Sequence, residues 1–115
     1  MKIVAVTACP AGIAHTYMAA ESLEREAKRR GYQIKVETQG SMGVENAISA
    51  REAQEADVVI FAVDMNINGA DRFSGKDIYR AGVSEAIRSP GKILDAAVRL
   101  IKKREARTDA GKESS

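Results

Sequence analysis

The sequence has 115 residues, of which 44% are hydrophobic and 30% charged, and its formal net charge is +2. This length suits one compact domain and is too short for two ordinary ones. The aromatic share is 4%, and much of the positive charge lies in Lys102–Arg104 and Arg107, so a base-stacking surface and nucleic-acid binding are not expected.

The first half of the chain predicts two strands with a helix between them. Lys2–Thr7 is rich in Val, Ile and Thr without helical periodicity, which is typical of a strand buried on both faces. Thr16–Arg30 places apolar residues on one face and Glu-to-basic pairs at i,i+4 spacing, and Gly31 follows where a helix commonly ends. Gln33–Thr38 alternates apolar and polar residues, which predicts a strand exposed on one face near a sheet edge.

A turn, a short helix and a third strand follow. Gln39–Gly43 carries two glycines, which is typical of a plain connection between elements. Ser49 and Glu52 have capping-box spacing and predict a helix of about two turns that ends near Ala56. Val58–Val63 is the most apolar strand pattern and is expected at the sheet centre. It is far shorter than the roughly 20 residues that span a bilayer, so no membrane insertion is expected.

The last third of the chain is less regular. Met65–Gly75 has the asparagine and glycine content of a loop, and Lys76–Arg80 predicts a short strand. Gly82–Ile87 predicts a helical turn, and Ser89-Pro90 predicts an N-cap followed by proline at the first position of a last helix. Residues 104–115 show no apolar periodicity, so we expect a polar tail or linker there.

The alternation of strands and helices predicts an α/β fold. Connection rules place about four strands in a parallel sheet with helices on both faces, a three-layer αβα sandwich of the flavodoxin-like or phosphatase-like Rossmannoid type. Residues 1–103 are expected to form this domain. Ligands of such sheets bind beyond the carboxyl ends of the strands. The turn after the first strand is therefore the expected binding site.

Cys9 lies in that turn and is the only cysteine. One cysteine excludes an internal disulfide, a CxxC redox pair and a cysteine-cluster zinc site, and it fits a reducing cytosol. A lone cysteine is more often a small buried apolar residue than a nucleophile. At a strand-to-helix turn, however, backbone N–H groups attract anions and favour the thiolate. This position predicts phosphate chemistry on sulfur.

The residues after Cys9 are the expected phosphate-binding groups. The candidate set is Pro10, Ala11, Gly12, Ile13, Ala14, His15 and Thr16. His15 fits three roles, as a helix cap, a phosphoryl ligand or a packed side chain, and Thr16 fits a bond to the thiolate or a local cap. The turn lacks the glycine patterns of dinucleotide and nucleotide loops, so no NAD or ATP is expected. Asp64 and Asp71 are candidate acids, although solvated loop carboxylates are commoner.

The segment Ala8–Leu23, ACPAGIAHTYMAAESL, resembles the active-site segment of the fructose-type enzyme IIB domains of the bacterial sugar phosphotransferase system. The family signature reads Cys-Pro-x-Gly-[Ile/Leu]-Ala-His-Thr-[Tyr/Phe]-Met-Ala-Ala. Ala11 stands where the family often has threonine. The resemblance covers about residues 1–103 and includes Val36–Gly40, Ala56–Ile60 and Arg72-Phe73.

This resemblance implies a phosphoryl carrier without a metal or cofactor. Cys9 would accept a phosphoryl group from the phosphohistidine of enzyme IIA and pass it to a sugar held by the membrane enzyme IIC. Fructose is the usual sugar of the family, and mannose, mannosylglycerate and other fructose-like sugars are alternatives. The expected place is the cytoplasm, at the inner face of the membrane through IIC. We expect IIA to dock on residues 10–14, 40–44 and 65–71.

Two other functions fit the same turn. The low-molecular-weight protein tyrosine phosphatases and related arsenate reductases use Cys-x5-Arg-[Ser/Thr], and here Cys9-x5-His15-Thr16 keeps the spacing with histidine for arginine. The sequence also lacks the Asp-Pro dipeptide that supplies the acid of those phosphatases. A non-catalytic module that binds phosphate or phosphoproteins would keep the anion-binding turn alone. The pattern fits both a free subunit and a domain of a longer IIBC or IIABC chain.

Overall fold

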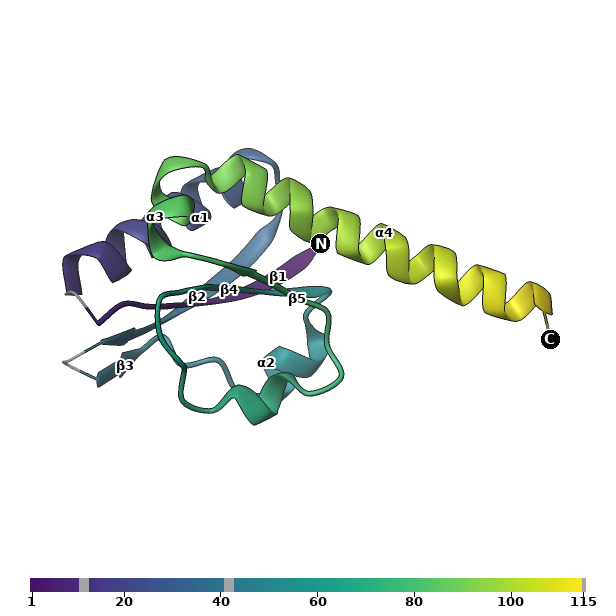
Figure 1. Cartoon of the computed structure of the whole chain (residues 1–115), viewed down its shortest axis with the longest axis horizontal. Helices are drawn as coiled ribbons and strands as arrows, with labels where there is room; N and C mark the ends of the chain where they lie inside the picture. The colour runs from purple at the N-terminus through teal and green to yellow at the C-terminus, as the bar shows by residue number, and fades with distance from the viewer. Residues whose placement is uncertain (11–12, 41–42, 115) are drawn as a thin grey trace.

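The computed structural model of the protein is built on a twisted sheet with helices on both faces (Figure 1). It describes residues 1–10, 13–40 and 43–114, and for residue 13 and residues 104–114 it describes the backbone alone. The elements are β1 (Lys2–Ala8), α1 (Ile13–Arg29), β2 (Gln33–Gly40), β3 (Gly43–Glu45), α2 (Ala50–Glu55), β4 (Val58–Val63), the 3-10 helix η1 (Ala70–Phe73), β5 (Ile78–Ala81), α3 (Val83–Arg88) and α4 (Pro90–Ser114).

The sheet has five strands in the order β3-β2-β1-β4-β5. Strands β1, β2, β4 and β5 are parallel, and β3 is antiparallel to β2. The central strand is thus β1, and β4, predicted at the centre, lies beside it. Thr7 pairs with Thr38 on one side and Ala62 on the other, so the carboxyl ends of three strands meet at one edge.

The α/β class with helices on both faces is confirmed, but the sheet has one strand more than predicted. The additional strand, β3, has three residues, all of them exposed. Such a short exposed strand has no apolar alternation that a sequence pattern could reveal. Its pairing begins at Gly40 and Gly43, on either side of residues 41–42, which lie outside the described residues.

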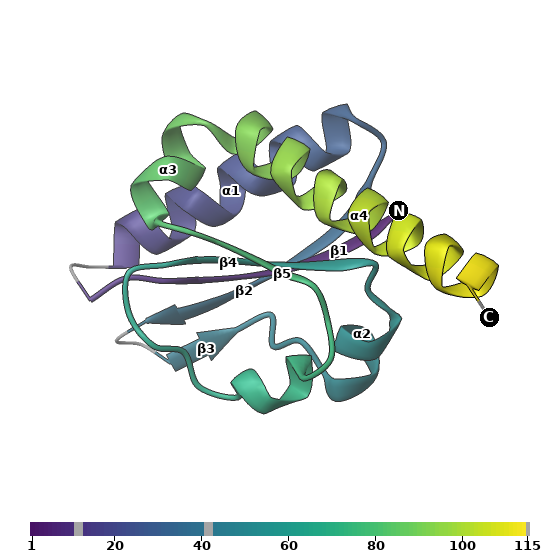
Figure 2. The ribbon, with the colours of Figure 1, turned by 45° about the vertical axis from the view of Figure 1, so that its right-hand side comes forward.

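Alternate strand residues face two separate cores. The core under α1, α3 and α4 includes Ile3, Ala5, Ile60, Leu23 and Leu94. The core under α2 and η1 includes Val4, Val6, Val59, Phe61 and Phe73. Figure 2 shows α1, α3 and α4 on one side of the sheet and α2 on the other. The sheet is therefore held from both faces, and this rigid base carries the loops at its edges.

Strand β2 departs from the prediction of one exposed face. Four of its eight residues, Val36, Glu37, Thr38 and Gln39, are buried in succession. The reason is a tertiary one, because the chain after β4 covers the side of β2 that alternation assigns to solvent. Glu37 is only 1% exposed as a result.

Helix α4 continues to Ser114, where the sequence predicted a tail from residue 104. It projects beyond the rest of the molecule (Figure 1). Residues 104–114 consist largely of Arg, Glu, Ala and Lys, which favour helix without any tertiary contact. The division at residue 103 stays a prediction. Within the part of the chain that the structure describes, none of the helices has the length and apolar content to cross a bilayer.

Two predicted helix boundaries are confirmed. Gly31 follows α1 with φ of +78°, a left-handed conformation that glycine adopts readily. At the start of α2, Ser49 Oγ accepts from the Glu52 N–H at 3.0 Å, and Glu52 Oε1 accepts from the Ser49 N–H at 3.0 Å. Lys35 also donates to Glu52, and these bonds lower the pKa of the Glu52 carboxyl to about 2.

We predict that Ser49→Ala lowers the free energy of unfolding by about 1 kcal/mol, because the Glu52 N–H loses its capping acceptor. Ser89→Ala is the matched control. Ser89 precedes α4, where the sequence predicted an N-cap, but its hydroxyl makes no hydrogen bond within the described residues, so its loss should change stability little. Urea denaturation of both variants measures the difference, and equal stabilities would contradict the role of the cap.

Candidate functional site

A pocket of about 320 Å³ opens at the carboxyl ends of β1 and β2. Three segments form it: the residues after β1, the β2–β3 hairpin and the loop after β4. Its described lining consists of Cys9, Pro10, Gln39, Gly40, Gly43, Val44, Met65 and Asn68. The structure thus places Cys9 with the β2–β3 and Met65–Asp71 regions that the sequence analysis named as a docking face.

Cys9 directly follows the central strand and is 8% exposed. It is a free thiol and packs against the core under α1. Helix α1 begins four residues later at Ile13, and the first N–H groups of a helix lack partners within it. Ala11 and Gly12 lie outside the described residues, so the predicted anion-binding turn stays a prediction.

The remaining candidates lie in the first turn of α1. Ala14 and His15 are exposed, whereas Thr16 is 1% exposed. Thr7 Oγ1 donates to the Thr16 carbonyl oxygen at 3.1 Å, which ties β1 to this turn. The Thr16 hydroxyl has no hydrogen-bond partner among the described residues, so the predicted bond to the Cys9 thiolate is not formed in this structure.

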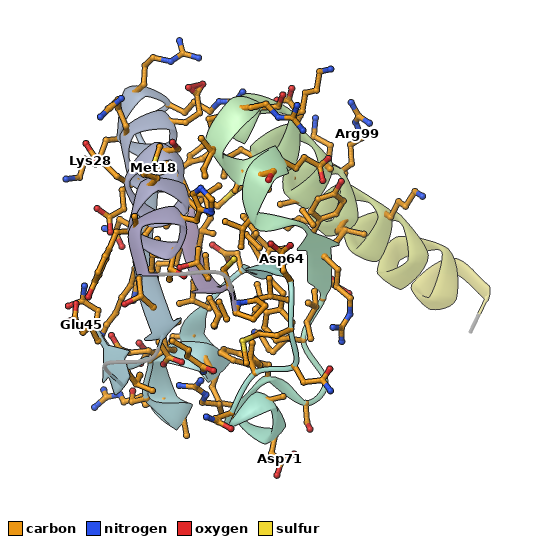
Figure 3. The ribbon with its side chains drawn as sticks, turned by 60° about the vertical axis from the view of Figure 1, so that its left-hand side comes forward. Met18, Lys28, Glu45, Asp64, Asp71 and Arg99 are labelled. Atoms are coloured by element: carbon orange, nitrogen blue, oxygen red, sulfur yellow. The ribbon has the colours of Figure 1, made fainter. Side chains whose placement is uncertain are left out.

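The two candidate acids have separate places. Asp64 follows β4, and its N–H donates to the Ala8 carbonyl oxygen at 2.9 Å, so it lies at the predicted edge. Its Oδ1 accepts from the Val83 N–H at 3.2 Å at the start of α3. Asp71 is an exposed residue of η1, and Figure 3 shows the two side chains well apart. They form no catalytic carboxylate pair.

Beside the pocket lies a buried ion pair for which the sequence analysis assigned no role. Arg72 Nη1 and Nη2 donate to the two oxygens of Glu37 at 2.6 and 2.7 Å. Glu37 also accepts from the Ile48 N–H at 2.7 Å and from Gln39 Nε2 at 2.7 Å. Burial raises the pKa of Glu37, but these hydrogen bonds outweigh it and leave the pKa below its usual value.

Gln39 connects this ion pair to the pocket. Its Oε1 accepts from the Asn68 N–H and its Nε2 donates to the Asn68 carbonyl oxygen, both at 2.9 Å. The sequence offered only a weak signal for this arrangement: Glu37 and Gln39 lie inside a strand pattern, and Arg72 lies in a loop. Both segments belonged to the family resemblance, but nothing local told which side chains would pair.

Four apolar side chains are exposed on the elements that lead into or out of the pocket, and two of them, Val44 and Met65, line it. Tyr17 and Met18 lie in α1, Val44 in β3 and Met65 after β4, and each is between 38% and 48% exposed. Figure 3 shows Met18 and Glu45 on the same side of the molecule. A hydrogen bond with the Glu45 carboxylate raises the pKa of the Tyr17 hydroxyl. Exposed apolar groups around a pocket are typical of a surface that binds another protein.

A family model and the similar known proteins all indicate the same family. Residues 4–96 match the family model for the PTS system, Lactose/Cellobiose specific IIB subunit. The chain is 52% identical over 93 residues to the PTS system fructose-like EIIB component 2 of Escherichia coli K12, a match that covers 81% of this chain and 88% of that one. It is 48% identical over 98 residues to the fructose-specific EIIB'BC component of Rhodobacter capsulatus, covering 85% of this chain and 17% of that longer one.

Solved structures give the same result. A domain of the fructose-specific IIABC component from Borrelia burgdorferi superposes with a TM-score of 0.80 at 52% identity, covering 84% of this chain and 91% of that one. The Enzyme IIB subunit of the PTS system from Escherichia coli K12 superposes with a TM-score of 0.82 at 36% identity, covering 90% and 96%. The likeness therefore extends over nearly the whole fold.

We predict that Arg72→Met lowers the free energy of unfolding by about 3–5 kcal/mol at neutral pH, because Glu37 stays buried without its cation. In this variant burial raises the pKa of Glu37 above its unfolded value, so the neutral carboxyl is favoured at low pH. The loss should therefore be smaller at pH 4 than at pH 7.

The matched control for this measurement is Arg51→Met, which breaks an exposed pair with Glu55. That change should cost at most about 0.5 kcal/mol at either pH. Urea denaturation at both pH values supplies the comparison. Equal losses for the two variants would show that the buried pair does not hold the fold.

Proposed function

We propose a function for this protein on the basis of its family. The chain belongs to the fructose-type IIB components of the bacterial sugar phosphotransferase system, which transfer phosphoryl groups in sugar uptake. Cys9 is the proposed phosphoryl carrier. It takes the group from a phosphohistidine of enzyme IIA and gives it to fructose, or to a fructose-like sugar, bound by enzyme IIC. This role places the protein in the cytoplasm, at the inner face of the membrane through IIC.

The observation that carries this proposal is the chemistry of the pocket. Among its described lining residues Cys9 is the one nucleophile, and none of the others carries a charge. In the first step the Cys9 thiolate attacks phosphorus, an S–P bond forms and the N–P bond to the donor histidine breaks. In the second step the oxygen of a sugar hydroxyl attacks phosphorus, an O–P bond forms, the hydroxyl proton passes to a base at the sugar site of IIC or to water, and the S–P bond breaks with its electron pair on sulfur, so that the thiolate returns.

Stabilisation of the transferring group is assigned to the turn after Cys9. The charge of a phosphoryl group spreads over its oxygens during transfer, and fixed N–H donors stabilise such charge. The proposed donors are the amides between Ala11 and Thr16, at the start of α1. No acid or base of the protein is required for the attack, because the thiolate is itself the nucleophile.

The proposed partners are IIA and IIC, and both must approach the face around Cys9. The relative from Rhodobacter capsulatus carries B and C components in one name, which supports IIC as a partner. IIA is proposed to dock over Cys9, between the start of α1, the β2–β3 hairpin and the loop after β4. Tyr17, Met18, Val44 and Met65 offer it exposed apolar contacts. A contact of this kind is small and transient, as a carrier with two successive partners needs.

We predict that Cys9→Ser keeps the fold and accepts no phosphoryl group, because a serine hydroxyl is a far weaker acid than a thiol and is not ionised near neutral pH. Incubation with a phosphorylated IIA domain, followed by mass spectrometry of the intact protein, measures the adduct. Circular dichroism confirms that the variant is folded. A phosphate adduct on the serine variant at the wild-type rate would contradict the assignment of Cys9.

We also predict that phosphorylated Cys9 is hydrolysed slowly. A phosphatase positions an arginine and an acid-base aspartate, whereas here His15 stands at the arginine position and Asp64 caps α3. A positioned acid-base group typically contributes ~10²–10⁴ in rate, so water should lack its activator. After removal of the donor, the adduct is followed at neutral pH. Rapid phosphate release without IIC or sugar, or turnover of an aryl phosphate, would favour the phosphatase-like alternative.

A further inference from the structure

Two segments that the carrier chemistry leaves without a role meet beside the pocket. Val36–Gly40 ends β2, and Arg72-Phe73 lies in η1. Glu37 and Arg72, 35 positions apart, bring them together through two parallel hydrogen bonds. The bond from the Ile48 N–H to Glu37 adds the segment before α2 to the same cluster.

The amide nitrogen and oxygen of the Gln39 side chain are both engaged in hydrogen bonds within this cluster. A glutamine amide has two N–H donors and one carbonyl acceptor. Here Nε2 donates to Glu37 Oε2 and to the Asn68 carbonyl oxygen, and Oε1 accepts from the Asn68 N–H. The side chain therefore pairs with both backbone groups of one residue, as a neighbouring strand would. It has no donor left for a phosphoryl group, although it lines the pocket.

The loop that Gln39 holds is one wall of the pocket. Residues 64–69 have no helix or strand of their own, and Met65 and Asn68 line the pocket with Cys9. Arg72 holds the next residue as well, since its Nε donates to the Gly69 carbonyl oxygen at 2.7 Å. Two successive loop residues are thus fixed to one buried cluster.

The ion pair orients these bonds. A buried ion pair recovers little net stability over an apolar pair of the same shape, because both charges lose their water. The pair instead determines orientation. The planar guanidinium of Arg72 fixes the orientation of the Glu37 carboxylate, and that carboxylate fixes the orientation of the Gln39 amide. Gln39 cannot rotate without losing a hydrogen bond to Glu37 or Asn68.

We propose that Gln39, oriented by the Glu37–Arg72 pair, is a positioning residue for phosphoryl transfer at Cys9, because it sets the place of the Met65–Asn68 wall beside the thiol. This inference rests on the proposed carrier function. A wall displaced by about 1 Å is enough to lower a transfer rate by as much as ~10²-fold. Gln39 acts through the loop and does not touch the phosphoryl group.

The test compares Gln39→Met with Leu94→Ala in the full chain. Methionine keeps the length of the side chain and removes every hydrogen bond to Asn68 and Glu37. Leu94 is a fully buried residue of α4, between Gly91 and Asp95, which bind Arg30 just after the C-terminal end of α1, whereas Cys9 precedes the N-terminal end of that helix. Urea denaturation gives the stability of each, and Leu94→Ala controls for a general loss of stability.

Two measurements are made on each variant. Amide hydrogen exchange at Asn68 should be about tenfold faster in Gln39→Met than in the wild type or in Leu94→Ala, because this N–H loses its acceptor. Phosphoryl transfer from a phosphorylated IIA domain should show a kcat lowered ~10- to 100-fold, with a smaller rise in KM because Met65 is one of the four proposed apolar contacts of IIA. Leu94→Ala should transfer at the wild-type rate at temperatures where it is folded.

A second variant keeps the test decisive if Gln39→Met does not fold. Arg72→Lys keeps the positive charge opposite Glu37 but lacks the fork that also reaches Gly69. It should show the same pattern with a smaller loss of kcat. Unchanged exchange at Asn68, a wild-type kcat in Gln39→Met, or an equal loss of kcat in Leu94→Ala would each overturn the positioning role. If the wild-type protein itself takes up no phosphoryl group from IIA, the proposed carrier function is wrong. A loss of transfer in the variants alone would leave that function standing.

Discussion

The site depends on a buried charge that must be fully paired. Glu37 is 1% exposed, and an ionised carboxylate at that depth is tolerated only when its oxygens are met by donors. Arg72, Gln39 and the Ile48 N–H meet it, and they come from three different segments. The same bonds that satisfy the charge also bring the loop after β4 against β2. One electrostatic requirement therefore determines where a wall of the Cys9 pocket lies.

The sheet supplies the rigid part of this arrangement. Strand β1 has a paired neighbour on each edge and a core on each face, so the residue that follows it, Cys9, is held at the end of the most constrained element. Thr7 adds a direct bond to the first turn of α1. If Cys9 is the nucleophile, as proposed, it needs little reorganisation before transfer, because the strand before it is fixed.

The uncharged lining of the pocket suits a carrier more than a hydrolase. A thiophosphate between neutral walls has no adjacent carboxylate or imidazole, within the described lining, to activate water. In the proposed mechanism the charge of the group is left to backbone donors at the helix start, which would stabilise it without taking up or releasing a proton. The exposed apolar residues Tyr17, Met18, Val44 and Met65 are the proposed contacts for the partners that would bring donor or acceptor to the sulfur.

What the sequence determined by itself is what short-range physics decides. The apolar run of β1, the capping box at Ser49 and Glu52, and the left-handed Gly31 depend on neighbours a few residues away, and each is where the pattern predicted it. Cys9 follows the end of β1 in the sequence, so the expected parallel sheet already put it at the edge where the carboxyl ends of the strands meet. The pairing of Glu37 with Arg72 and of Gln39 with Asn68 was decided only by the tertiary structure, as were the short strand β3 and the order that puts β1 at the centre. Strand alternation assigned Glu37 to solvent, because a local pattern records which residues can be buried but not which distant group arrives to neutralise a buried charge.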